Sequence, residues 1–238
     1  MTDNSISSNT VYGGLLILAI VLSALFWMRQ ARHEPRLMGV FIAALAGAFL
    51  GAKALYILIE GRGDWSEPDR WARLASGKTV IGALLGGFIG VECAKRAMSY
   101  TRVTGDLFAS VVPASVALGR IGCWRAGCCL GRVCDAGPWA LVDQQGTPRW
   151  PAVPMEFVFN LLALAAFWLM RRRQLLTGQH FHLYLIAYGC FRIAHEPLRA
   201  TPKWESGLSG YQFAAALLVL VGTLAFWKRA HETPRAHA

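Results

Sequence analysis

Long apolar stretches are the feature that most limits what this chain can fold into. A helix of roughly twenty apolar residues with few or no charges is long enough to cross about 30 Å of hydrocarbon. Such stretches recur along the 238 residues, and 55% of the sequence is hydrophobic against 16% charged. An ordinary soluble domain is less apolar. We therefore expect an all-α, polytopic membrane protein. The seven predicted spans are roughly 11–28, 37–59, 79–94, 106–121, 152–170, 180–197 and 207–227.

Basic residues in the short loops predict the orientation. Lysines and arginines follow the first, third, fifth and seventh spans, and these four sets fall on one side of the membrane. The positive-inside rule makes that side cytoplasmic, so we expect the N-terminus outside and the C-terminus inside. The first span has no Lys or Arg before it and no cleavage pattern after it, so we expect it to stay as a helix.

The remaining segments predict one membrane domain, 1–238, with three extracytoplasmic loops at about 60–78, 123–150 and 198–206. The first loop contains Trp65 and Trp71 among mixed charges, a composition that favours an interfacial helix. The second contains the short apolar run 139–142, which predicts a small cap or a strand-like arm over a site.

The net charge of +10 raises the question of a nucleic-acid partner. The basic residues are scattered through juxtamembrane loops, and no long basic tract or aromatic-interleaved patch occurs. We expect no nucleic acid as a partner and assign this charge to attraction for anionic membrane lipids.

Four of the six cysteines gather in the second outer loop, at Cys123, Cys128, Cys129 and Cys134. Disulfides are permitted outside the cytoplasm, but Cys128 and Cys129 are adjacent and do not suit an ordinary structural pair. Zinc is conceivable, but the C-x4-C-C-x4-C spacing is not a standard zinc signature. We therefore predict no metal and no cofactor.

The end of the fourth span carries three arginines among glycines, in the segment 119–132. Arginine is costly in a bilayer, and at membrane depth it usually faces a cavity and holds an anion. Glycine exposes backbone N–H groups to such an anion. The segment therefore predicts a phosphate pocket near the lipid headgroups. Its predicted residues are Gly119, Arg120, Gly122, Gly131 and Arg132.

A second set of charges lies at the outer end of the sixth span. On a helix Arg192, Glu196 and Arg199 fall at i, i+4 and i+7 and share one face. Glu196 is placed to hold an arginine in a fixed rotamer. For Arg199, near the span end, a snorkelling surface ion pair is an equally good interpretation. We predict that Arg120, Arg192 and Glu196 act in catalysis and that Arg199 binds substrate.

Three other polar positions and one glycine pattern need an interpretation. Lys53 lies mid-span, too deep to snorkel, and is expected to pair inside the bundle. Lys78 begins the third span near the interface. His195, beside Glu196, is expected to pack or to lie at the interface rather than to act in catalysis. The glycines of the third span predict close helix packing; they are Gly82, Gly86, Gly87 and Gly90.

Short motifs follow one another in order along almost the whole chain. They are Tyr12-Gly13 in the first span, Gly51-Ala52-Lys53 with Tyr56 in the second, Gly119-Arg120-Ile121-Gly122 and Gly131-Arg132 around the end of the fourth, Pro151 and Glu156 at the start of the fifth, Arg192, Glu196 and Arg199 in the sixth, and Gln212 in the seventh.

This set of motifs resembles the prolipoprotein diacylglyceryl transferase family, integral membrane enzymes that lipidate bacterial lipoprotein precursors. The resemblance implies seven spans with the N-terminus outside, in the bacterial plasma (inner) membrane. It implies transfer of the diacylglyceryl group of phosphatidylglycerol onto the cysteine thiol of a prolipoprotein, with release of glycerol phosphate. Tyr12, Lys53, Lys78 and Gln212 complete the predicted substrate-binding residues.

The chain departs from the family pattern in two places. The family signature continues with Asn and then Asn-Gly-Glu, where this chain has Cys123 and Ala126-Gly127-Cys128. The family also has His-Gly-Gly at the start of the third span, and its histidine is thought to assist catalysis. This chain has Ile81-Gly82-Ala83 there, so the histidine is missing. The base that would deprotonate the acceptor thiol is therefore unassigned, with Glu196, His195 and the cysteines as candidates.

Two other functions stay open at this point. One is a paralogue that transfers a phosphatidylglycerol-derived group to another extracytoplasmic acceptor. The other is a non-catalytic, lipid-binding membrane protein that keeps the headgroup pocket. The missing histidine favours both, whereas the presence of Arg120, Arg192 and Glu196 argues against the second.

Overall fold

The computed structural model of the protein describes residues 3–61 and 70–231. Within these ranges the chain is helical apart from loops and one two-stranded sheet. The elements are α1 (Asp3–Gln30), the 3-10 helix η1 (Ala31–His33), α2 (Pro35–Glu60), α3 (Arg70–Ser76), α4 (Val80–Ala97), α5 (Gly105–Arg125), β1 (Leu141–Val142), β2 (Pro148–Arg149), α6 (Ala152–Arg172), α7 (His180–His195), the 3-10 helix η2 (Glu196–Leu198) and α8 (Gly210–His231).

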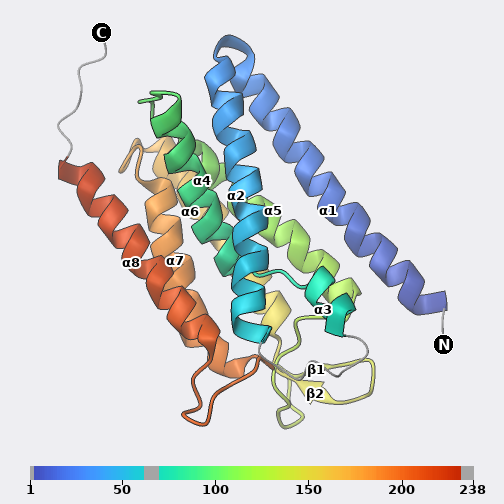
Figure 1. The fold of residues 1–238 in the computed structure, drawn as a ribbon. Helices are drawn as coiled ribbons and strands as arrows, with labels where there is room; N and C mark the ends of the chain where they lie inside the picture. The colour runs from blue at the N-terminus through green and yellow to red at the C-terminus, as the bar shows by residue number, and fades with distance from the viewer. Residues whose placement is uncertain (1–2, 62–69, 232–238) are drawn as a thin grey trace.

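The long helices run alternately up and down in one bundle (Figure 1). α3, the β1–β2 hairpin and the segment between α7 and α8 lie together at one end, which we call the loop end. α1 begins at the loop end, and α8 finishes at the opposite end. All three predicted outer loops therefore gather on one side of the bundle, although residues 62–69 of the first lie outside the described residues.

Each predicted span coincides with one long helix in the described ranges. Five of these helices, α1, α2, α5, α6 and α8, are long and apolar enough to cross a membrane. The other two fall short of that measure, since α4 ends in the charged residues Glu92, Lys95 and Arg96 and α7 has only 16 residues. The chain is therefore an all-α membrane protein, as its composition predicts.

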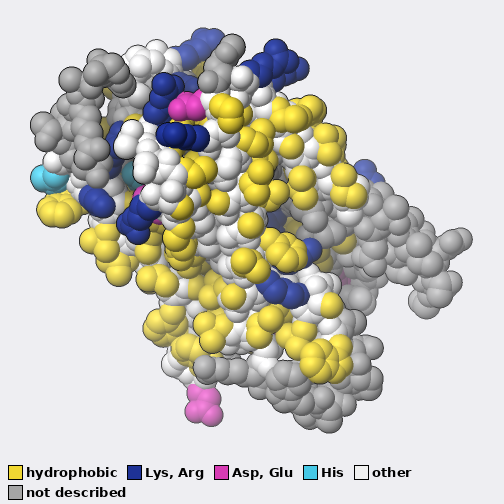
Figure 2. Space-filling model, turned by 45° about the horizontal axis from the view of Figure 1, so that its top comes forward, with side chains coloured by type: hydrophobic (Ala, Val, Ile, Leu, Met, Phe, Trp, Pro, Cys, Tyr) yellow, Lys and Arg dark blue, Asp and Glu magenta, His cyan; other side chains and the backbone are white. Residues whose placement is uncertain are grey.

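Large hydrophobic side chains cover the flanks of the bundle. Phe49 and Leu50 on α2, Leu162 on α6, and Leu224 and Trp227 on α8 are all more than half exposed. Figure 2 shows hydrophobic side chains along the sides and lysines and arginines gathered mainly at the end opposite the loop end. An apolar surface this wide is rare on soluble proteins and suits a hydrocarbon surrounding.

Glycines hold α2 and α4 in close contact. A Cβ added at Gly86 would lie 2.2 Å from the carbonyl oxygen of Gly47, and one added at Gly82 would lie 2.3 Å from that of Gly51. Lipid tails are as apolar as the helix surfaces, so no hydrophobic force drives helices together inside a membrane. Helix association there depends on close van der Waals packing of this kind. The predicted role of the third-span glycines in packing is thus confirmed at these positions.

Two helix ends differ from their predicted positions. The fourth span was expected to end at residue 121, but α5 continues to Arg125 and stops at Gly127, whose φ of +62° closes the helix. The sixth span was expected to continue to 197, and Arg199 to share its helical face. α7 instead ends at His195, because Pro197 has no N–H with which to continue the helix, and Arg199 is extended.

Two loop predictions agree with the structure. The apolar run 139–142 contributes β1, which pairs antiparallel with β2 through Leu141 opposite Arg149 and Val142 opposite Pro148. The strand-like arm is thus a short hairpin at the loop end. In the first loop, α3 is a helix of 7 residues, in the region where an interfacial helix is expected.

The glycine contact predicts a destabilised variant. Gly86→Ala should destabilise the protein by ~1–3 kcal/mol, because the added methyl group collides with the backbone of α2. The midpoint of thermal unfolding in detergent is the measurement. Gly14→Ala is the matched control, since a Cβ there has nothing within 4 Å. Equal midpoints for the two variants would contradict the packing argument.

Candidate functional site

A buried carboxylate on α6 brings together three arginines, which belong to α5, to α7 and to the segment after α7. Glu156 has no exposed surface, and Arg120 of α5 donates to its Oε1 from Nη2 at 2.9 Å. Arg192 of α7 and Arg199, just beyond α7, each place Nη1 3.3 Å from its Oε2. The hydroxyl of Tyr188 also donates to Oε1, at 2.6 Å. We call Glu156, Glu196 and the three arginines the arginine centre.

Glu196 is the second carboxylate of the arginine centre. Arg192 donates to its Oε2 from Nη2 across one helical turn, and the Nε of Arg199 lies 3.9 Å from the same oxygen. Thr201 and Ser209 donate to Oε1 at 2.7 and 3.4 Å. The predicted contact between Arg192 and Glu196 is confirmed. The interpretation of Arg199 as a surface ion pair is wrong, because its side chain is buried.

The arginine centre carries one positive charge in excess. Three arginine residues, each no more than 6% exposed, face two buried carboxylates. The Nε groups of Arg192 and Arg199 have no hydrogen-bond partner among the described residues. Burying an uncompensated charge is costly unless a partner neutralises it. The centre is therefore suited to bind an anion of single negative charge.

Close backbone contacts hold Arg199 in place. Gly131 and Arg199 form an antiparallel bridge, and the N–H of Ala200 donates to the carbonyl of Leu130 at 3.1 Å. A Cβ at Gly131 would lie 2.0 Å from the carbonyl oxygen of Trp150, so only glycine fits there. Gly131 thus acts by permitting this contact between loops, which joins the segment after α5 to the one after α7.

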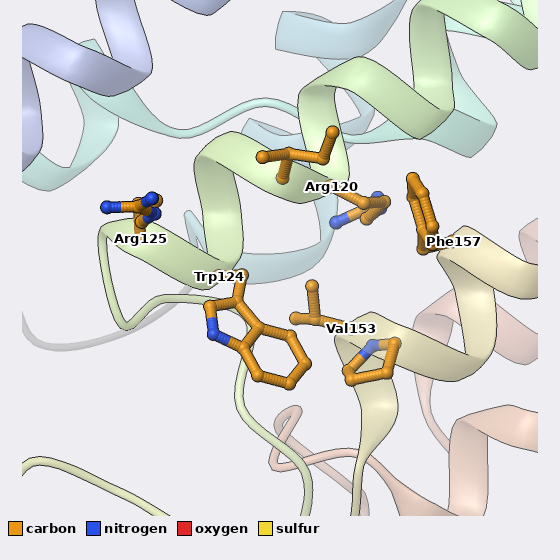
Figure 3. Close-up of a pocket in the computed structure, with 7 residues that line it drawn as sticks. Arg120, Trp124, Arg125, Val153 and Phe157 are labelled. Atoms are coloured by element: carbon orange, nitrogen blue, oxygen red, sulfur yellow. The ribbon is translucent and has the colours of Figure 1, made fainter.

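A cavity of about 180 Å³ opens beside the arginine centre between α5 and α6 (Figure 3). Trp124, Val153 and Phe157 give it an apolar wall. In Figure 3 the side chain of Arg120 extends from α5 toward Phe157 of α6, whereas Arg125 lies on the far side of α5. The cavity thus offers an apolar surface together with the side chains of Arg120 and Arg125, a combination that suits a lipid with an anionic headgroup.

A second cavity, of about 210 Å³, adjoins the first under the β1–β2 hairpin. Both cavities share Trp124, Val153 and Pro154 in their walls. The second is also lined by Cys123 and Cys128 and by polar loop residues. The two cavities lie on either side of a common wall, one facing apolar side chains of the helices and the other facing the loop end.

Three cysteine sulfurs meet at the end of α5. The Sγ atoms of Cys123, Cys128 and Cys129 all lie within 4.8 Å of one another, and Arg120 donates from Nη1 to the sulfur of Cys123 at 3.6 Å. The guanidinium groups of Arg120 and Arg199 lie close enough to the Cys129 thiol to act on it electrostatically. These thiols are free in the structure.

The predicted partner of Lys53 is a helix end. Its ammonium group donates to the backbone carbonyls of Leu74, Ala75 (2.7 Å) and Gly77 (3.4 Å), at and just beyond the C-terminal turn of α3. Lys53 therefore pairs inside the protein, as expected of a deep lysine, and ties α3 to α2. Its predicted contact with substrate stays a prediction. Lys78 is exposed just before α4.

Gln212 caps the start of α8. Its N–H donates to the Ser209 hydroxyl at 3.3 Å, and its Oε1 accepts from the Ser209 N–H at 3.0 Å. This reciprocal pair is a capping box. Because Ser209 also donates to Glu196, the cap lies one hydrogen bond from the arginine centre. A direct contact of Gln212 with substrate stays a prediction.

The other predicted binding residues lie around the same end of α5. Gly122 is buried in the helix, Gly119 has open space around its Cα, and Arg132 presents an exposed side chain. The backbone of Arg132 accepts from the N–H of Trp150 at 2.9 Å. Tyr12 lies in α1, but its side chain is outside the described residues.

The central position of Glu156 and its contact with Tyr188 were not predicted from the sequence. One signal was present: a single glutamate one turn into an otherwise apolar helix needs a buried partner. His195 is also buried near the arginine centre, and both of its ring nitrogens lack a hydrogen-bond partner among the described residues. It stacks on Phe191, with ring centroids 4.9 Å apart, which agrees with the expected packing role.

The fold and this site together define a helical membrane protein with a buried cluster of three arginines and two glutamates at one end of the bundle. A family model for prolipoprotein diacylglyceryl transferase matches residues 6–228, and the chain belongs to that family.

Individual relatives agree with this assignment. The chain is 28% identical over 231 residues to the phosphatidylglycerol–prolipoprotein diacylglyceryl transferase of Clostridium tetani, covering 90% of this chain and 91% of that protein. It is 28% identical over 248 residues to the protein of that name from Paracidovorax citrulli, covering 94% and 92%. For the Thermotoga maritima protein the identity is 27% over 236 residues, covering 90% and 79%.

The geometry predicts that Glu156→Gln is strongly destabilising. Loss of this carboxylate leaves three buried guanidinium groups facing one acid, at a cost of about 3–5 kcal/mol. Thermal unfolding in detergent is the measurement, and Glu205→Gln, the same change on an exposed residue, is the control. Adding Arg199→Gln to Glu156→Gln should recover part of the loss, since it removes one unpaired charge. An unchanged midpoint for Glu156→Gln would contradict the central role of this residue.

Proposed function

We propose that the protein transfers the diacylglyceryl group of phosphatidylglycerol to the thiol of a prolipoprotein cysteine. The observation that carries this proposal is the single excess positive charge of the buried arginine centre. The phosphodiester of phosphatidylglycerol carries one negative charge, so a bound lipid headgroup would neutralise the centre. Membership of the family and the names of its relatives support the same substrates.

The lipid would enter from the side of the bundle. The first cavity combines apolar walls with Arg120, so acyl chains would lie against Trp124 and Phe157 while the phosphate meets the guanidinium group. Arg192 of α7 and Arg199, just beyond α7, contact the same carboxylate and would complete the headgroup site. Their unpartnered Nε groups would serve as further donors.

The charge of the arginine centre also suits the chemical step. The acceptor sulfur attacks the glycerol carbon that bears the phosphate, a C–S bond forms, and the C–O bond to phosphate breaks. The electron pair of that bond stays on the phosphate oxygen, so negative charge grows on the departing glycerol phosphate. Fixed guanidinium donors in a water-poor site stabilise such charge.

The proposed topology has seven membrane spans, with the N-terminus and the loop end outside the plasma membrane of a bacterium. The ends of α1, α4, α6 and α8 opposite the loop end carry basic residues in their last turns. That distribution supports a cytoplasmic position for this end. The arginine centre would then lie near the outer headgroups, where exported prolipoproteins are accessible.

Replacement of an arginine at the centre should abolish transfer. Arg120→Ala should lower turnover at least ~100-fold, because loss of one preorganised donor to a developing anion costs about that much. The assay incubates purified protein with phosphatidylglycerol and a lipobox peptide and detects the diacylglyceryl peptide and glycerol phosphate by mass spectrometry. Arg173→Ala, at the opposite end of the bundle, should retain normal turnover.

The same assay separates the proposed function from its alternatives. Near-normal turnover in Arg120→Ala would overturn the arginine centre as the phosphate site. Release of glycerol phosphate by the unaltered protein without a peptide product would indicate another acceptor. Neither product, with phosphatidylglycerol still bound, would indicate a lipid-binding protein without this activity.

A further inference from the structure

The proposed transfer needs a group that deprotonates the acceptor thiol. The two glutamates and the histidine near the site do not explain this step. Glu156 and Glu196 are both held by arginines and accept several hydrogen bonds, so neither is placed to take a proton. His195 stacks on Phe191. The cysteine cluster, by contrast, adjoins a cavity and contacts Arg120 directly.

The backbone after α5 is shaped to bring three sulfurs together. The N–H groups of Gly127 and Cys128 return to the carbonyls of Trp124 and Cys123, at 3.2 and 3.1 Å, in a Schellman turn. Cys129 then adopts a φ of +59°, a left-handed conformation that costs free energy in a residue other than glycine. This turn brings Cys128 and Cys129 back beside the last turn of α5, where Cys123 lies.

The sequence spacing of these cysteines is not a standard zinc signature, but the folded loop brings their three sulfurs to distances that fit one metal ion. Zinc bound by thiolates at ~2.3 Å in tetrahedral geometry needs sulfurs about 3.8 Å apart. The sulfurs here lie within 4.8 Å of one another, so small side-chain rotations are enough. Arg120 donates to the sulfur of Cys123, the kind of outer contact that orients a metal-bound ligand.

We propose that Cys123, Cys128 and Cys129 bind one zinc ion as three thiolates and that its fourth position receives the thiol of the acceptor cysteine. Three protein ligands with an open position are typical of catalytic rather than structural zinc. Cys134 is not part of the cluster, so no fourth thiol of this loop closes the site. Cys128 and Cys129 are exposed, and the 210 Å³ cavity lies beside Cys123 and Cys128, so an extended peptide has access.

This inference rests on the proposed transfer reaction and supplies its missing deprotonation. A thiol that coordinates zinc loses its proton, so the acceptor sulfur would be a thiolate without a basic side chain. Its sulfur forms the new bond to the glycerol carbon as the C–O bond breaks. The electron pair leaves with the glycerol phosphate, and the proton released from the thiol reaches that product or the solvent. No oxidant or reductant is needed.

Metal content tests the site without any assay of transfer. The full chain, purified in detergent under reducing conditions from cells supplied with zinc, should contain about one zinc per chain by mass spectrometry of the elements. The triple variant Cys123→Ser, Cys128→Ser, Cys129→Ser should contain none, whereas Cys134→Ser should match the unaltered protein. If the triple variant fails to fold, Cys129→Ser alone should lower the zinc content several-fold.

Cobalt replacement reports the coordination and the open position. After removal of zinc, Co²⁺ should give thiolate-to-cobalt charge-transfer absorption in the unaltered protein and none in the triple variant. A lipobox peptide added without phosphatidylglycerol should shift the visible cobalt bands. The same peptide with serine in place of its cysteine should leave them unchanged.

The outcomes separate this inference from the proposed function. An unaltered protein with neither zinc nor cobalt absorption, or a triple variant that keeps its zinc, would overturn the zinc site even if transfer occurs. Cobalt bands unmoved by the cysteine peptide would overturn the role of the fourth position. Zinc and a cobalt shift without lipid transfer would leave the site in place and overturn the proposed transfer reaction instead.

Discussion

The shared carboxylate of Glu156 is the interaction on which the functional end of the bundle depends. It accepts from guanidinium groups that belong to α5, α7 and the segment after α7, so one side chain positions three parts of the chain. A charge in a low-dielectric interior is tolerated only with partners. None of these groups is stable there alone, and they must assemble together. The helices that present them are fixed relative to one another as a result.

Under the proposed function, the site would separate two kinds of substrate by position. Arg120 lies at the boundary between the two cavities. Its Nη2 contacts the carboxylate of Glu156, and its Nη1 donates to the sulfur of Cys123. On one side lies a cavity between α5 and α6 with apolar walls, and on the other a cavity roofed by the hairpin at the loop end. A membrane lipid and an exported peptide would reach a common point from opposite directions, which is what a transfer between them requires.

One of the two departures of this chain from its family pattern, the segment around Cys123, lies on the side of Arg120 that faces the second cavity. The arginine centre, which would meet the phosphate, keeps the expected Arg120, Arg192 and Glu196. The positions that change are the segment around Cys123 and the histidine expected near Gly82. A phosphate always needs fixed positive charge, whereas a thiol loses its proton equally well to a base or to a metal ion. The groups that deprotonate the acceptor thiol can therefore be replaced more readily than the positive charges that bind the phosphate.

Much of this protein follows from its sequence alone, because some physical rules act over short distances along the chain. Apolar length predicts the helices, and helical periodicity places Arg192 beside Glu196. Other features depend on residues that are far apart in sequence. The meeting of Glu156 with Arg120, the burial of Arg199 beyond the end of its helix, and the use of Lys53 to hold α3 have no local pattern. Only the packed bundle determines these contacts. A buried charge needs a partner, and which partner it meets depends on the side chains that the tertiary fold brings next to it.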